Sequence, residues 1–139
     1  MKNKSLLLIK PLAFKNKKAG KIISMIEEGG FDIVALKQLN LTEDIAKKFY
    51  AIHKERPFFG DLVKFMTSGK IVAICVEKEN CVEDLRKLVG NTDPAKADDG
   101  TIREAVGTNI EANGVHASDS EENAINEIRF FFSAFEVLL

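Results

Sequence analysis

Cysteine and histidine are scarce in this chain, and their scarcity excludes several kinds of site. There are 2 cysteines and 2 histidines among 139 residues. Cys75 lies within an apolar run and Cys81 at a predicted helix start, which fits neither a disulfide framework nor zinc-ligand spacing. We therefore expect ordinary thiols in a reducing compartment and no metal ion held by the protein.

The chain also lacks an excess of charge of either sign and a long hydrophobic run. Its 20 basic and 21 acidic side chains leave a formal net charge of -1. No global field would attract nucleic acid or an anionic membrane, and no strand carries a basic aromatic motif. Lys10 and Pro11 end the apolar run over residues 5–9, and this run is too short for a signal peptide. We expect a cytoplasmic protein that binds neither a membrane nor specific nucleic acid.

What remains is enough for one globular unit. With 139 residues and 45% hydrophobic side chains, the chain can fill one core but is too short for two ordinary domains. It contains no internal repeat and no linker, so we expect a single domain over residues 1–139.

Apolar patterns predict four strands separated by helices. Continuous or β-branched apolar runs predict strands over residues 5–9, 31–39, 71–76 and 115–117. Helical spacing and capping residues predict helices that begin at Ala19, after Thr42, after Asn80 and at Ser120. A further short helix is predicted with Pro57 in its first turn. Strands alternating with helix pairs and short connections favour an α+β sandwich.

Two of these helices carry more detailed expectations. Asn80 with Glu83 resembles a capping box. The last helix should present one apolar face, made of Ile125, Ile128, Phe132 and Phe135. Residues 91–110, by contrast, are polar and show no sustained period, which is typical of a functional or disordered loop.

A histidine stands where the last predicted strand leads into the last helix. Residues 113–119 read Asn-Gly-Val-His-Ala-Ser-Asp. A helix beginning near Ser120 would direct its unpaired N–H groups towards His116, which favours a bound anion. An imidazole with an unperturbed pKa of roughly 6.5 is partly neutral at neutral pH, so its free nitrogen can act as a nucleophile. The alternative is a structural or surface histidine.

Glu127 can reach this histidine. If the chain reverses near Ser120, about 13 Å of strand leads back to His116 and about 10 Å of helix leads on to Glu127, so the two come level. The carboxylate could then accept a hydrogen bond from the imidazole and leave the other nitrogen facing a substrate. The alternative is a solvent-facing glutamate.

The stretch over residues 113–119 resembles the active-site signature of the nucleoside diphosphate kinases, Asn-x-x-His-(Gly/Ala)-Ser-Asp, at every fixed position. Other family-like pieces follow in order over essentially the whole chain: Ile9-Lys10-Pro11, Ala51-Ile52-His53, Pro57-Phe58-Phe59, Thr67-Ser68-Gly69, Asn91-Thr92-Asp93-Pro94 and Gly100-Thr101-Ile102-Arg103. The resemblance implies a ferredoxin-like βαββαβ sandwich with a four-stranded antiparallel sheet, a helical hairpin insertion and a long loop on the nucleotide side.

The resemblance also implies the reaction. His116, held by Glu127, would take the terminal phosphoryl group of a nucleoside triphosphate and pass it to a nucleoside diphosphate, with ping-pong kinetics and broad base and sugar tolerance. Ser118 would steady Glu127. The Mg²⁺ would arrive on the nucleotide phosphates.

The resemblance assigns further contacts to the nucleotide. The phosphates would meet cations and their neighbours, and the base and sugar would meet apolar and amide side chains. The contacts expected for the phosphates are Lys10, Arg86, Arg103, Tyr50, His53 and Thr92. Those expected for the base are Phe58, Leu62 and Ile110, and those for the sugar are Lys10 and Asn113.

Two departures and one apolar segment qualify this picture. Leu12 stands where the family usually has Asp, and Glu104-Ala105-Val106 replaces the usual Gly-Asp-Phe. They leave open a ferredoxin-like nucleotide-binding or regulatory module with weak or lost chemistry. Residues 130–139 carry more apolar side chains than one helix face can bury, which predicts a subunit interface there or on the second strand. Family members are homo-oligomers, so a tetramer is favoured, with a dimer or hexamer as alternatives.

Overall fold

A four-stranded antiparallel sheet forms the centre of the computed structural model, which describes residues 1–138. The strands are β1 (Lys2–Ile9), β2 (Asp32–Asn40), β3 (Lys70–Glu79) and β4 (Val115–Ala117), in the spatial order β2-β3-β1-β4. Each neighbouring pair is antiparallel. This is the α+β ferredoxin-like arrangement expected from the sequence.

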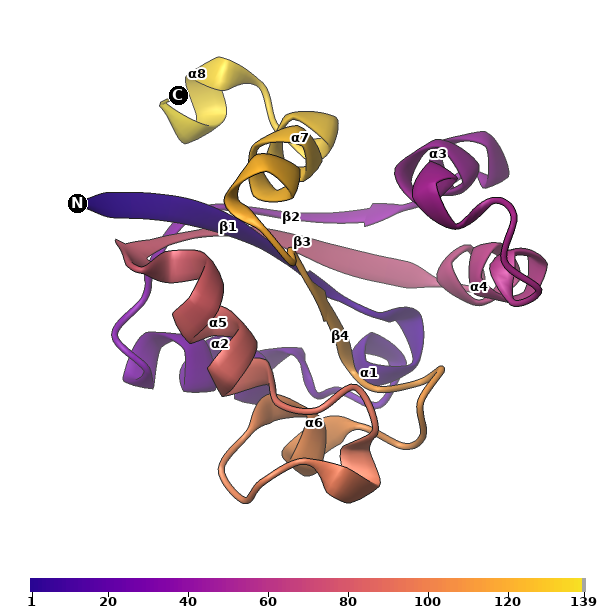
Figure 1. Ribbon diagram of the computed structural model, residues 1–139, viewed down its shortest axis with the longest axis horizontal. Coiled ribbons are helices and arrows are strands. Elements are labelled where there is room, and N and C mark those ends of the chain that lie inside the picture. The colour runs from indigo at the N-terminus through magenta and orange to yellow at the C-terminus, as the bar shows by residue number, and fades with distance from the viewer. Residues whose placement is uncertain (139) are drawn as a thin grey trace.

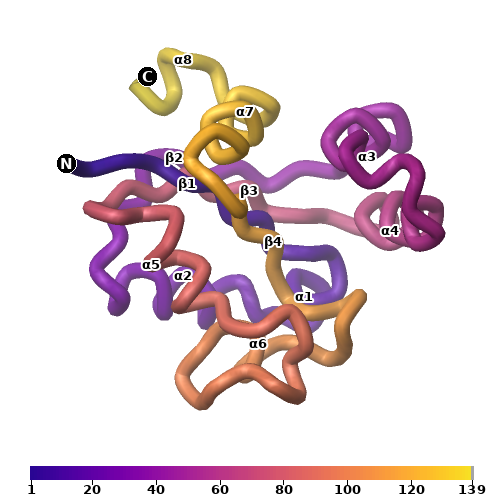
Figure 2. Tube along the Cα trace, in the orientation of Figure 1, coloured from indigo at the N-terminus to yellow at the C-terminus, as the bar shows by residue number. Residues whose placement is uncertain are grey.

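Helices cover both faces of the sheet (Figure 1). Helices α2 and α5 lie on one face, α7 and α8 lie on the other, and the α3–α4 hairpin stands between the end of β2 and the start of β3. In the Cα trace, the loop that contains α6 lies beyond the start of β4 (Figure 2). The helices are α1 (Pro11–Lys15), α2 (Ala19–Glu28), α3 (Glu43–Phe49), α4 (Phe59–Met66), α5 (Cys81–Val89), α6 (Ile102–Val106), α7 (Glu121–Phe131) and α8 (Ala134–Val137), with 3₁₀ turns η1 (Ala51–His53) and η2 (Pro94–Lys96).

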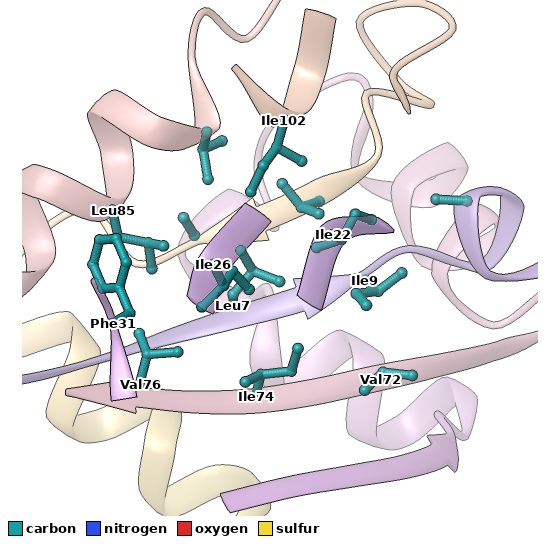
Figure 3. Packing of buried hydrophobic residues seen from close by; sticks show 14 of the residues in the cluster. Leu7, Ile9, Ile22, Ile26, Phe31, Val72, Ile74, Val76, Leu85 and Ile102 are labelled. Atoms are coloured by element: carbon teal, nitrogen blue, oxygen red, sulfur yellow. The ribbon is translucent and has the colours of Figure 1, made fainter. Parts of the chain in front are cut away.

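The continuous apolar run of β1 divides into two cores because successive strand residues point to opposite faces. Leu7 and Ile9 pack with α2 and α5 in the first core (Figure 3). Leu6 and Leu8 pack on the other face with side chains of α3, α4 and α7. All four side chains are fully buried, so packing on both faces holds β1 rigidly. The end of β1 can therefore fix the position of the residue that follows it.

The helix starts are only partly as predicted. Thr42 and Ser120 accept hydrogen bonds from the backbone N–H groups of Ile45 and Asn123, as N-caps should. The capping box at Asn80 is wrong, because this residue adopts a left-handed backbone (φ 54°) and its side chain caps no N–H group. Pro57 also lies outside α4, whose N-cap is Phe58.

The single apolar face predicted for the last helix is wrong in part. The helix α7 ends at Phe131, and Ser133 starts α8 with a capping box of its own. The break buries Phe132 but leaves Phe135, in α8, 88% exposed, and Ile125 is exposed too. The loop over residues 91–110 likewise contains η2 and α6, which are too short to show a sequence period.

Gly114, just before β4, gives a first testable prediction. Its φ of +90° favours glycine, and an added Cβ would lie 2.7 Å from Val106 Cγ2. Gly114→Ala should therefore lower the free energy of unfolding by about 1–3 kcal/mol in urea titrations. The control is Gly20→Ala in α2, where an added Cβ meets nothing within 4 Å and should stabilise by about 0.5–1 kcal/mol. Equal stability of the Gly114→Ala variant and the unmodified protein would contradict this reading.

Candidate active site

His116 and Lys10 are brought together by the pairing of β1 with β4. His116 lies opposite Leu8 in the register, and the backbone N–H of Lys10 donates to Gly114 O at 2.9 Å. Because the strands are antiparallel, the end of β1 meets the start of β4 at one edge of the core. Two segments more than a hundred residues apart therefore supply the imidazole and an adjacent cation.

The imidazole is held by a carboxylate on α7. His116 Nε2 donates to Glu127 Oε1 at 2.7 Å, and Ser118 Oγ donates to the same oxygen at 2.8 Å. The backbone N–H of Leu6 in turn donates to Ser118 Oγ at 3.4 Å. An ionised carboxylate only accepts, so Nε2 carries the proton and Nδ1 keeps the lone pair of a nucleophile.

Lys10 is a buried cation that binds the segment leading into β4. Its Nζ donates to Asn113 Oδ1 at 2.8 Å and to Glu111 O at 3.4 Å. Burial, assisted by the charge of Arg103, lowers the pKa of Lys10 to about 8. The Asn113 amide also donates to Thr92 O at 3.0 Å, so one side chain links Lys10 to the loop over residues 91–110.

Two arginines face one hollow. A cavity of about 240 Å³ is lined by Arg86, Arg103 and Thr92, together with Val89, Gly90, Asn91 and Ala117, and none of these side chains is acidic. Burial and the neighbouring Arg86 lower the pKa of Arg103 to about 10. Two close cations without a carboxylate between them favour an anion in the hollow, because its charge would offset their repulsion.

The backbone holds Arg103 in place. Its Nη1 and Nη2 donate to Gly90 O at 3.1 Å and Val115 O at 3.0 Å. The remaining Nε is buried and has no partner among residues 1–138. A buried donor without a partner is costly, which is a second reason to expect a polar ligand here.

Aromatic side chains lead from His116 to the surface. The Tyr50 ring meets His116 edge-on at 6.1 Å, and His53 stands between Tyr50 (6.5 Å) and Phe58 (5.6 Å). Burial raises the pKa of Tyr50, whose hydroxyl has no partner within the described residues, so it stays a neutral donor. Of the proposed base contacts, Phe58 and Ile110 are exposed and Leu62 is half-buried.

One ring beside His116 was missed by the sequence analysis. Phe49 lies 5.3 Å from the imidazole. In the sequence it belongs to the apolar face of a short helix, which is typical of an ordinary core residue. Nothing in that spacing distinguishes it from its neighbours.

The departures from the family pattern lie outside the His116–Glu127 pair. Leu12 is in α1 and lines a separate hollow with Pro11, Phe14 and Phe65. Glu104 is exposed in the first turn of α6, where Thr101 Oγ1 accepts from its backbone N–H. Val106 packs on Gly114, so the altered segment supports the loop before β4.

Among residues 1–138, no group of three or more His, Cys, Asp or Glu side chains could hold a metal ion. No helix in this part of the chain is long and apolar enough to cross a membrane.

A ferredoxin-like sandwich that holds an imidazole with its carboxylate partner, and that also contains a cation-lined hollow, has the groups that a phosphotransferase needs, because cations stabilise a moving phosphoryl group and the imidazole can carry it. The profile described as nucleoside diphosphate kinase matches residues 3–137. The chain belongs to the nucleoside diphosphate kinase family.

Individual relatives agree over nearly their full length. The chain is 51% identical to the nucleoside diphosphate kinase of Geobacter sp. (strain M21), over 94% of this chain and 96% of the relative. It is 52% identical to that of Helicobacter pylori (strain P12), over 96% and 97%. The solved Aquifex aeolicus enzyme superposes with a TM-score of 0.96 at 40% identity, covering 99% of both chains. These findings confirm the family resemblance, the fold class and the enzyme class.

Proposed function

We propose that the chain exchanges terminal phosphoryl groups between nucleoside triphosphates and diphosphates through a phosphohistidine on His116. The observation that carries this proposal is the 2.7 Å hydrogen bond from His116 Nε2 to Glu127, which leaves Nδ1 as the nucleophile. A neighbouring structure, the Halobacterium salinarum enzyme (TM-score 0.93, 32% identity, covering 99% of this chain and 91% of that one), was solved with CDP and supports a nucleotide ligand.

The reaction balances in two half-reactions. The Nδ1 lone pair attacks the γ-phosphorus, the bond to the bridging oxygen breaks, and that oxygen leaves on the diphosphate with the electron pair. Glu127 stabilises the positive charge that develops on the ring. A terminal oxygen of the second diphosphate then attacks the phosphorus, and the electron pair of the P–N bond returns to Nδ1.

The cations and polar side chains around His116 would hold the phosphates and the sugar. Lys10, Arg86 and Arg103 would stabilise the charge spread over the transferring group. Tyr50, His53 and Thr92 would add polar contacts to the phosphates. Asn113, with Lys10, would bind the sugar hydroxyls, and Ser118 would keep Glu127 in position.

The base would be read by shape alone. Phe58 would stack on it, and Leu62 and Ile110 would add apolar contact. Stacking is tolerant because every base has a π-face. Purines and pyrimidines, with ribose or deoxyribose, should therefore all be accepted.

We propose that Mg²⁺ is bound by the nucleotide. The residues that line the arginine hollow include no carboxylate, so the oxygen ligands that Mg²⁺ prefers would be phosphates and water. When bound, the ion neutralises phosphate charge. Excess EDTA should lower activity at least about 100-fold, and added Mg²⁺ should restore it in proportion to the Mg–nucleotide complex. Full activity in EDTA would contradict this.

We also propose a homo-oligomer, with a tetramer favoured and a dimer or hexamer as alternatives. The edge strand β2 exposes backbone groups and Leu36 (47% exposed), and the tail exposes Phe135 and Leu138 (81%), whereas Leu139 lies outside the described residues. The chain should work as one domain in the cytoplasm, without a membrane or specific nucleic acid as partner.

Light scattering after size exclusion tests the oligomer. At micromolar concentration the mass should be a multiple of 15.4 kDa. Leu36→Lys should lower it, because a lysine on an edge strand opposes pairing with a second strand. Ile45→Lys, at a similarly exposed position on α3, is the control and should not change it. A monomeric unmodified protein would contradict the proposal.

The two half-reactions test the proposed function directly. After incubation with γ-labelled ATP and removal of nucleotide, the protein should carry an acid-labile, alkali-stable label. Added GDP should then remove the label and yield labelled GTP. Nucleotide binding without label would instead support the regulatory module, with the altered Glu104-Ala105-Val106 segment as its origin.

A further inference from the structure

Phe49 is the centre of the aromatic cluster behind the proposed nucleophile. Its ring lies 5.3 Å from His116, 4.9 Å from Tyr50, 5.5 Å from Phe130 and 5.2 Å from Phe131. It is the last residue of α3, whereas Phe130 and Phe131 close α7. One half-buried side chain therefore joins the helical hairpin, the strand of the histidine and the helix of its carboxylate partner.

Phe49 packs on the same face of α7 that carries Glu127. Residues four apart on a helix are neighbours on its surface, so Phe131 lies beside Glu127. The imidazole therefore has two neighbours tied to α7: Glu127, which accepts its hydrogen bond, and the Phe49 ring, which packs on Phe131 one turn further along. Two different groups set its orientation from adjoining positions.

The hydrogen bond to Glu127 alone leaves the imidazole one degree of freedom. It favours one direction of the Nε2–H bond, but Nε2 lies close to the axis of the Cβ–Cγ bond, so the ring can still turn partly about that bond. The χ2 torsion of histidine is broad and does not prevent this. Such a turn would sweep the Nδ1 lone pair away from the line of attack on phosphorus, where alignment controls the rate.

The geometry points to Phe49 as a positioning residue for the phosphoryl transfer. Its ring meets the imidazole at an interplanar angle of 72°, and this edge contact blocks rotation of the ring plane that Glu127 cannot prevent. The inference rests on the proposed function of His116 and adds a residue to it. Phe49 touches neither the phosphorus nor the nucleotide in this role and acts only through the imidazole.

The test separates this role from general packing. Phe49→Leu and Phe49→Met remove the ring but keep apolar volume, whereas Phe49→Tyr keeps the ring. Phe132→Leu is the matched control, because Phe132 is buried (4% exposed) in the same core and its ring is paired with neither Phe49 nor His116. Rapid-quench measurements with γ-labelled ATP give the maximal rate of His116 phosphorylation and the apparent nucleotide affinity for each variant.

Phe49→Leu and Phe49→Met should lower the maximal phosphorylation rate about 10-fold while nucleotide affinity changes less than about 2-fold. Phe49→Tyr should restore most of the rate. Phe132→Leu should lower the melting temperature at least as much as Phe49→Leu, yet keep the phosphorylation rate within about 2-fold of the unmodified protein, since it leaves the contacts of the Phe49 ring in place.

Nuclear magnetic resonance of labelled histidine gives a second measurement, which reports whether the Phe49 ring contacts His116 in solution. The carbon-bound protons of the His116 ring should shift in Phe49→Leu, because the ring current is removed, and shift little in Phe132→Leu. Unchanged phosphorylation rates in both ring-removing variants would overturn the inference. An unmodified protein that never becomes labelled would instead overturn the proposed function, so the two failures are distinguishable.

Discussion

His116→Gln is expected to lower kcat by a factor on the order of 10⁴ or more and to abolish labelling by γ-labelled ATP. The glutamine amide can still donate to Glu127, so the pocket and its hydrogen bond are kept while the nucleophilic nitrogen is lost. Without a covalent intermediate, two polyanionic nucleotides would have to meet in one cation-lined hollow. Steady-state rates and labelling of the same preparation measure the loss.

The second histidine provides the control. His53 lies near Tyr50 and Phe58 and makes no proposed bond to phosphorus. His53→Gln should keep the label and raise KM only several-fold, as expected for one lost polar contact. Retention of label in His116→Gln with loss in His53→Gln would reassign the nucleophile to the surface histidine.

Lys10→Met should lower kcat/KM by about 10²–10³-fold, the second-largest effect expected. The methionine keeps much of the buried stem but removes the charge that stands beside the histidine strand and binds Asn113. Without it the transferring phosphoryl group loses a cation, and the loop link through Asn113 to Thr92 loses its anchor. Both losses weaken transition-state binding more than simple nucleotide binding.

The pKa of Lys10 gives this prediction a pH signature. Because its pKa is lowered to about 8, the side chain is cationic below that pH and loses its charge as pH rises through it. kcat/KM, which reports the free enzyme, should therefore fall above about pH 8. Bound phosphates favour the charged form, so the fall in kcat should come at higher pH. Lys10→Met should lose this limb, and a limb that persists unchanged would contradict the assignment.

The parts of the fold that the sequence predicted are those decided locally. Buried strands show as continuous apolar runs, and Thr42 and Ser120 lie just before the periodic residues of their helices, where capping needs them. The family resemblance pointed to Glu127, and the rise per residue of a strand and a helix allowed it to reach His116. The family signature then supplied roles that spacing alone could not give.

The parts that it did not predict depend on tertiary contacts. Asn80 adopts a left-handed backbone and does not form the capping box predicted for it. The chain also breaks between α7 and α8, where Ser133 caps α8 within an apolar run that looked continuous. The lowered pKa of Lys10 depends on its burial and on the nearby charge of Arg103, and the position of Phe49 depends on how α3 packs against α7. A one-dimensional pattern carries no information about such neighbours.

The proposed function requires that His116 carry the phosphoryl group between two nucleotides. Mass spectrometry at alkaline pH, after mixing with excess ATP and Mg²⁺, can detect this phosphohistidine. We expect one added phosphoryl group per chain, located on His116 by fragmentation and removed by a nucleoside diphosphate. An active protein in which that group never forms, or forms on another residue, would refute this role of His116.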